Sequence, residues 1–165
     1  MELQIRRDDL RGPEVAALLR RHLEHSAQHS PPESVHALDL DRLRRPDITF
    51  WTAWSDGLLV GCGGLQELAP DHGEIKSMHT AEEYRGRGIA ARLLGHLLEE
   101  ARVRRYRRVS LERGSPEAFA PARALYARHG FQTCPPFASY REDPYSVYMT
   151  LELLEGPGAT TGGER

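Results

Sequence analysis

The turn Arg85–Ala90 carries the clearest chemical signal in the chain. Its sequence, Arg-Gly-Arg-Gly-Ile-Ala, leads directly into a segment with strong helical periodicity. Glycines leave room for the backbone to approach a ligand, and the first turn of a helix presents unpaired N–H groups at the positive end of its dipole. The side chains of Arg85 and Arg87 add positive charge. These features predict an anion site suited to a pyrophosphate, and the alternative is an ordinary strand-to-helix turn.

The turn differs from two well-known phosphate loops. No Gly-Lys-Ser/Thr follows it, and Gly86-x-Gly88 lacks the third glycine of the dinucleotide fingerprint. Arg85-x-x-Gly88-x-Ala90 instead resembles the Arg/Gln-x-x-Gly-x-Gly/Ala signature of the GNAT superfamily of acetyl-CoA-dependent N-acetyltransferases. A second segment, Ala122–Phe131, resembles the family's Ala-x-x-Leu-Tyr-x-x-x-Gly-Phe motif. Both motifs occur in the family's order, and the resemblance extends over Leu3–Leu154.

The resemblance implies how acetyl-CoA would be bound as a co-substrate. In this family the strand before the turn and the strand after the long helix splay apart, so that unpaired backbone groups bond the pantetheine arm. Those groups would lie near Met78, His79 and Thr80. The backbone amides that hold the pyrophosphate would belong to Arg85, Gly86, Arg87, Gly88, Ile89 and Ala90. One departure is Arg105, which stands where relatives often have glycine, so we expect a non-glycine residue in a left-handed conformation there.

Transfer of an acetyl group from a thioester to an amine raises two proton problems. The attacking amine must lose a proton, and the leaving thiolate needs one. The resemblance assigns Tyr126 as the general acid, and the alternative is a tyrosine that packs its helix on the sheet. Glu74 is the candidate base and precedes Arg85 by 11 positions. By resemblance, a strand glutamate at the equivalent offset acts as the base in the histone-acetylating branch of the superfamily. The alternatives are a Glu74–Lys76 pair on a solvated face, His79 as the base, or a chain of waters. Strand alternation predicts that Glu74, Lys76 and Met78 share one face.

Three histidines and two loop regions complete the candidates. His22, His25 and His29 share a helical face at a spacing that could hold a metal, but no carboxylate or cysteine motif completes a set. We therefore expect a solvated or partner-facing histidine stripe and no metal. By resemblance, the acceptor would lie against His25–Leu40 and Pro135–Tyr148. The residues there that could attract or wall an amine, together with Trp51, are Glu33, Asp39, Tyr140, Glu142, Asp143 and Tyr145. The sequence does not name the acceptor.

The elements that must position these residues follow the order β-α-α-β-β-β-α-β-α-β-β. Asp56–Gly57 predicts a hairpin, and the glycines of its second strand indicate a bulge or a close backbone approach. Together with the resemblance, this order predicts an α+β, GNAT-like fold in which a mixed central sheet of six to seven strands is flanked by about four helices. The expected strands are Leu3–Arg6, Ile48–Ser55, Leu58–Glu67, Glu74–Thr80, Arg108–Glu112, Phe131–Thr133 and Ser146–Leu154. The expected helices run from Pro13 to a break at Ser30–Pro32, and over Val35–Leu43, Gly88–Arg104 and Pro116–His129.

Length and composition limit the classes of protein that this chain can be. With 165 residues, 39% of them hydrophobic, we expect one domain over residues 1–154 and a flexible tail over 155–165. The charged N-terminus and the short apolar stretches predict neither a signal peptide nor a membrane span, and we expect a cytoplasmic protein. The two cysteines form neither a metal spacing nor a disulfide framework.

The net charge of −2 argues against wholesale nucleic-acid binding, yet it hides an uneven distribution. Arg85–Arg108 holds eight arginines and two glutamates, and Lys76 is the only lysine.

The resemblance implies an N-acetyltransferase that moves an acetyl group from acetyl-CoA to a primary amine of a small molecule, or of a peptide, in a ternary complex. The alternatives are a non-catalytic acyl-CoA sensor and a nucleic-acid-binding protein that uses Arg102–Arg108. A homodimer is compatible with the family.

Overall fold

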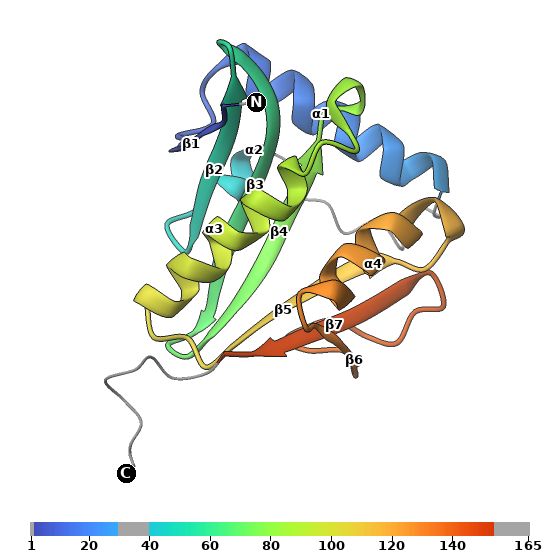
Figure 1. Cartoon of the computed structure of the whole chain (residues 1–165). Coiled ribbons are helices and arrows are strands. Elements are labelled where there is room, and N and C mark those ends of the chain that lie inside the picture. The colour runs from blue at the N-terminus through green and yellow to red at the C-terminus, as the bar shows by residue number, and fades with distance from the viewer. Residues whose placement is uncertain (1, 30–39, 154–165) are drawn as a thin grey trace.

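A mixed seven-stranded sheet forms the centre of the computed structural model, which describes residues 2–29 and 40–153 (Figure 1). The strand order is β1-β2-β3-β4-β5-β7-β6. Neighbouring strands are antiparallel except for the parallel pair β4 and β5. The strands are β1 Gln4–Arg7, β2 Ile48–Ser55, β3 Leu58–Ala69, β4 His72–Thr80, β5 Arg108–Gly114, β6 Gln132–Cys134 and β7 Ser146–Glu152. The helices are α1 Pro13–His29, α2 Leu40–Leu43, α3 Ile89–Val103 and α4 Ala120–Arg128, with 3-10 turns η2 Glu82–Tyr84 and η3 Glu117–Phe119.

The hairpin between β2 and β3 forms at Asp56–Gly57, as predicted. Both residues have positive φ, 52° and 78°, and Ser55 pairs with Leu58 across the two-residue loop. Two successive positive φ values match the right-handed twist of the flanking strands, which is why this dipeptide favours a hairpin.

The helices cover the two faces of the sheet. On one face, α3 and α4 pack their apolar residues into the larger core cluster, and α1 and α2 pack into the second cluster on the other face (Figure 1). The strand glycines allow α3 to come close, because a Cβ atom on Gly61 would lie 2.9 Å from a methyl carbon of Leu93. The sequence prediction of a close backbone approach is confirmed.

Most expected elements are found, with shifted ends. The expected strand Glu74–Thr80 begins two residues earlier, at His72, as β4. The expected helix Pro116–His129 is divided into η3 and α4, with Pro121 in the first turn of α4. Only the end of the expected helix Val35–Leu43 lies within the described residues, as α2. The expected tail over residues 155–165 lies outside them.

A bulge in β4 makes one sequence prediction wrong. The pairing of β4 with β3 shifts between the Cys62 and Gly64 positions, and Ser77 has a φ of 52°. The extra residue reverses the alternation of side chains beyond it. Met78 therefore joins Leu97 in the core under α3, and Glu74 and Lys76 lie on the opposite face.

Candidate active site

The sheet opens between β4 and β5. Their parallel pairing covers only three residue pairs and ends at Glu74–Ser110. Beyond that point β5 continues to pair with β7, and Met78, His79 and Thr80 lie along a cavity of 410 Å³. The lining includes residues of both α1 and α4, which cover opposite faces of the sheet. The cavity therefore passes through the gap between the two strands.

The glycine turn forms one wall of this cavity. Gly86 and Gly88 have φ values of 79° and 80°, in the left-handed region that glycine adopts without strain. Gly88 is the N-cap residue of α3 and offers no side-chain cap, so the first N–H groups of that helix are available to a ligand. Of the residues that the sequence assigned to acetyl-CoA, all except Arg87 line the cavity. The guanidinium of Arg87 instead lies over the ring of Tyr84, 5.1 Å from its centre.

Tyr126 reaches the cavity from α4 and is 1% exposed. Its ring packs edge-on against Phe131, with 5.6 Å between the ring centres. Its hydroxyl oxygen accepts a 3.4 Å hydrogen bond from the guanidinium of Arg113. The two roles that the sequence left open, packing and chemistry, are therefore compatible, because the ring is part of the core and the side chain also lines the cavity.

Arg113 is the residue that sequence analysis missed. It lies on β5 and donates a 2.7 Å hydrogen bond to the carbonyl of Met78, across the gap where the strands no longer pair. Its Nε atom is buried and has no hydrogen-bond partner. An arginine near the end of a strand gives no signal in a sequence with 21 arginines, and only the topology places it beside Met78.

Two of the histidines meet at the α1 side of the cavity. The rings of His22 and His79 pack against each other at a tilt of 43°, with centres 4.8 Å apart, and His22 is 5% exposed. Burial, followed by the charges of Arg85 and Arg113, lowers the pKa of His79 to about 3. Burial and the charge of Arg113 also hold the pKa of His22 well below its ordinary value. The expectation of a solvated or partner-facing histidine stripe is wrong for His22, which is a neutral, buried side chain.

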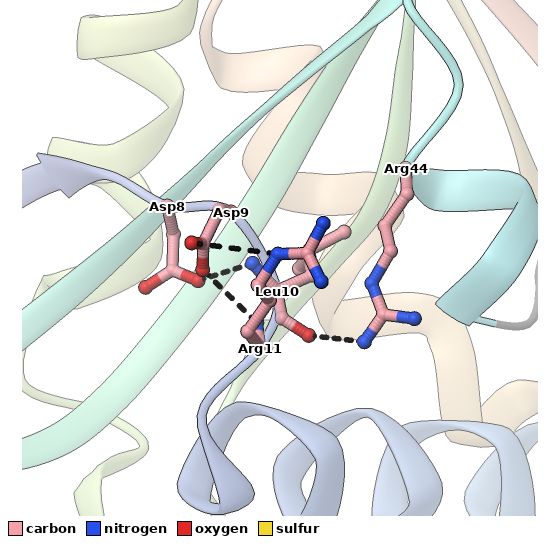
Figure 2. A network of polar contacts seen from close by, with 5 residues as sticks. All are labelled: Asp8, Asp9, Leu10, Arg11 and Arg44. Atoms are coloured by element: carbon pink, nitrogen blue, oxygen red, sulfur yellow. Dashed lines mark hydrogen bonds and ion pairs between the residues drawn. The ribbon is translucent and has the colours of Figure 1, made fainter.

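Polar contacts of Asp8 and Arg44 with Leu10 hold the chain between β1 and α1 (Figure 2). Asp8 accepts a 2.7 Å hydrogen bond from the backbone N–H of Leu10, which has a φ of 66°. Arg44 donates a 2.7 Å hydrogen bond to the carbonyl of Leu10. The Asp8 side chain also accepts a hydrogen bond from Thr52 on β2. These contacts hold the turn between β1 and α1, where the chain reverses its direction.

Glu74 lies at the vertex of the gap but not in the cavity lining. It is 2% exposed, forms a 3.1 Å ion pair with Lys76, and accepts a 2.7 Å hydrogen bond from the hydroxyl of Tyr140. Lys76 and Tyr140 are 3.3 Å apart at their polar ends. The Glu74–Lys76 pair therefore exists, but in a buried cluster and not on a solvated face.

The described ranges contain neither a metal-binding cluster nor a membrane-spanning helix. Within residues 2–29 and 40–153, no group of three or more His, Cys, Asp or Glu is arranged to hold a metal ion. In the same ranges, no helix has the length and apolar character needed to cross a membrane. The run Arg102–Arg108 suggested a nucleic-acid-binding surface. One of its arginines, Arg104, already donates hydrogen bonds to Glu100 and Thr49.

A sheet that opens at a parallel strand pair, beside a helix N-terminus without a side-chain cap, is the arrangement expected for the acyltransferase class that both sequence motifs resemble. The chain belongs to the GNAT acetyltransferase family, whose model matches residues 13–131. It is 52% identical over 151 residues to YsnE of Bacillus subtilis (strain 168), with 92% of this chain and 100% of YsnE covered. It is 47% identical over 151 residues to YedL of Escherichia coli (strain K12), with 92% of this chain and 95% of YedL covered. Both relatives are named as uncharacterized N-acetyltransferases.

A solved structure supports the same fold. A GNAT family acetyltransferase from Elizabethkingia anophelis, crystallised with acetyl-CoA bound, superposes with a TM-score of 0.68 at 19% identity. The match covers 92% of this chain and 98% of that protein. The predicted α+β fold with a mixed sheet and four α-helices over the described residues is confirmed, and the chain is an N-acetyltransferase enzyme.

Proposed function

We propose that this enzyme transfers the acetyl group of acetyl-CoA to a primary amine of a small molecule, by direct attack in a ternary complex. The observation that carries the proposal is the cavity through the sheet, whose lining joins the glycine turn, the open edge of β4 and Tyr126. A pyrophosphate at the N-terminus of α3 would leave the pantetheine arm free to extend along Met78–Thr80 toward the gap. The acetyl-CoA held by the Elizabethkingia protein supports this donor.

The proposed chemistry needs two proton movements. The amine nitrogen forms a bond to the acetyl carbon, the carbon–sulfur bond breaks, and the departing sulfur takes a proton from Tyr126. The buried position of the Tyr126 oxygen supports this role, because a proton donor is most effective where water does not compete. Tyr126 then recovers its proton from solvent, which also receives the proton that the amine nitrogen loses as it becomes an amide.

Two side chains of β4 are candidates to receive the amine's proton. His79 lines the cavity, but its pKa of about 3 makes it a weak base. Glu74 is a carboxylate at the vertex of the gap, with Lys76 and Tyr140 as its present partners. We therefore propose Glu74 as the base, with water carrying the proton to it from the amine, since its oxygens do not line the cavity.

The test combines binding and turnover. Acetyl-CoA at about 100-fold excess over its Kd is expected to stabilise the protein by about 2.7 kcal/mol, measured by thermal unfolding. Release of the CoA thiol is then followed with a panel of primary amines. Stabilisation together with amine-dependent thiol release supports the proposal. Stabilisation without turnover for any amine would favour an acyl-CoA sensor, and the absence of stabilisation would overturn the proposed donor.

A further inference from the structure

The described lining of the cavity has an unusual balance of charge. It contains three arginines and three histidines, and no aspartate or glutamate. Arg85 and the turn have an anionic partner in the proposed pyrophosphate. Arg113 lies at the gap itself, where it donates to the carbonyl of Met78 and where the proposed function puts the reacting amine. A cationic acceptor without any negative group would meet only like charge and imidazole there.

Two buried polar atoms of the residues that line the cavity have no hydrogen-bond partner among the described residues. The Nδ1 atom of His22 is one, on a side chain that is 5% exposed and lines the cavity. The Nε atom of Arg113 is the other. A buried donor without a partner costs free energy, and a buried guanidinium costs more when its hydrogen-bond partners among the described residues are a carbonyl and a hydroxyl, neither of which carries a negative charge. The Nε–H group of Arg113 is a donor, and the Nδ1 atom of His22 donates when the ring carries its proton on that nitrogen.

The chemistry that satisfies both groups at once is a carboxylate. Its oxygens accept hydrogen bonds from a guanidinium in a planar geometry and from an imidazole N–H, and its charge balances that of Arg113. A neutral carbonyl would satisfy the hydrogen bonds but not the charge. The ring of His79 lies tilted against that of His22, and the Nδ1 atom of His22 is buried without a hydrogen-bond partner among the described residues.

We propose that Arg113 and His22 bind a carboxylate group of the substrate, so that the acceptor is an amine which also carries a carboxylate, such as an amino acid. The inference rests on the proposed function and narrows its substrate class. The same carboxylate could be carried by the acyl chain of the donor, as in a dicarboxylic acyl-CoA. Both sources present the same group to Arg113, and the experiment below separates them.

The first arm uses matched acceptors with acetyl-CoA as the donor. The panel pairs free amino acids with their carboxamides, so that only the carboxylate differs within each pair. Because charge-assisted hydrogen bonds to a buried group are strong, we expect kcat/KM to be roughly 10- to 100-fold higher for the acid member of the preferred pair. The second arm compares acetyl-CoA with succinyl-CoA on an amine that has no carboxylate. A preference for succinyl-CoA there, and no preference in the first arm, would assign the carboxylate to the donor.

Variants of the chain test the assignment to Arg113. Arg113→Gln is expected to remove the preference for the acid within each pair, and Arg113→Lys to restore part of it. Arg92→Gln is the matched control, because Arg92 is an exposed arginine of α3 outside the cavity lining. This control is expected to keep the full preference. His22→Phe is expected to weaken the preference while retaining a ring against His79.

The outcomes are distinct from those of the proposed function. If acetyl-CoA does not stabilise the protein, the proposed function fails first. If acetyl-CoA binds but no pair in either arm favours the carboxylate, the inference is wrong and the proposed function stands. The inference is also wrong if the preference survives Arg113→Gln, or if that variant raises only the KM for acetyl-CoA, which would assign Arg113 to the pantetheine arm.

Discussion

The hydroxyl of Tyr126 accepts a hydrogen bond from Arg113, with 3.4 Å between the phenolic oxygen and the guanidinium nitrogen. A guanidinium has donors but no acceptor, so this contact cannot use the tyrosine's own proton. The proton therefore remains available to a group in the cavity. The ring is held at the same time by its edge contact with Phe131.

Tyr126→Phe is expected to lower kcat roughly 100-fold or more, because it removes the proposed acid while the ring keeps its packing. The KM for acetyl-CoA is expected to change little. Steady-state thiol release with acetyl-CoA and an accepted amine measures both values. The control is the thermal midpoint of the variant, which is expected to stay near that of the wild type. A fully active variant would remove Tyr126 from the mechanism.

Gly88→Val is expected to abolish the thermal stabilisation by acetyl-CoA. A β-branched residue is strained at a φ of 80°, and its side chain would cover the N–H groups at the start of α3. The matched control is Gly95→Ala, because Gly95 lies within the same helix, has no positive φ, and has open space around a new Cβ atom. The control is expected to gain up to about 1 kcal/mol of stability and to keep acetyl-CoA binding. Equal binding by both variants would contradict an anion site at the turn.

Glu74→Gln is expected to lower kcat most at low pH and to leave the affinity for acetyl-CoA unchanged. Without a base, the reaction depends on the fraction of amine that is already neutral, and this fraction rises with pH. The rate of the variant should therefore approach that of the wild type at high pH. The measurement is a pH profile of kcat for both proteins. Tyr140→Phe and Lys76→Met serve as controls, since they disturb the same cluster and retain the carboxylate.

Local patterns in the sequence were sufficient to predict most of the fold. The stripe of α3, the turn at Asp56–Gly57 and the two motifs each depend on residues that are neighbours in sequence, and all are found in the structure. The bulge at Ser77 could not be predicted from a local sequence pattern in the same way. Serine carries no signal for a positive φ, so simple alternation placed Met78 on the wrong face.

The site was harder to predict where it joins distant elements. Arg113, His22 and Tyr126 come from β5, α1 and α4, and only the topology of the sheet brings them to one cavity. Tyr126 was found because it lies within a motif. Arg113 lies in none. The ion pair of Glu74 was anticipated, but its burial depends on Tyr140, which lies 66 positions away.

Arg105→Gly is expected to raise the free energy of unfolding by roughly 0.5–1 kcal/mol. Arg105 has a φ of 64° at the end of α3, which confirms the predicted left-handed residue, and its neighbour Tyr106 donates back to the carbonyl of Ala101. Glycine adopts this conformation without the steric cost that a Cβ atom brings. The control is Arg107→Gly, at an exposed position without positive φ, which is expected to lower stability. Urea unfolding of both variants measures the difference.

The buried histidine pair predicts how stability depends on pH. The folded-state pKa of His79 is about 3, below its ordinary value of 6.5, so the unfolded chain takes up a proton between these values and the folded protein does not. Stability is therefore fully present above about pH 6.5 and is lost as pH falls toward 3. Each such histidine adds at most about 1.4 kcal/mol per pH unit to the slope. His79→Gln is expected to reduce the slope measured by urea unfolding between pH 5 and 6.5, where most carboxylates are already ionised. His22→Gln should act in the same direction, because its pKa is also lowered. An unchanged slope in the double variant would mean that both rings are protonated in the folded protein, and that the pair does not stay neutral beside Arg113.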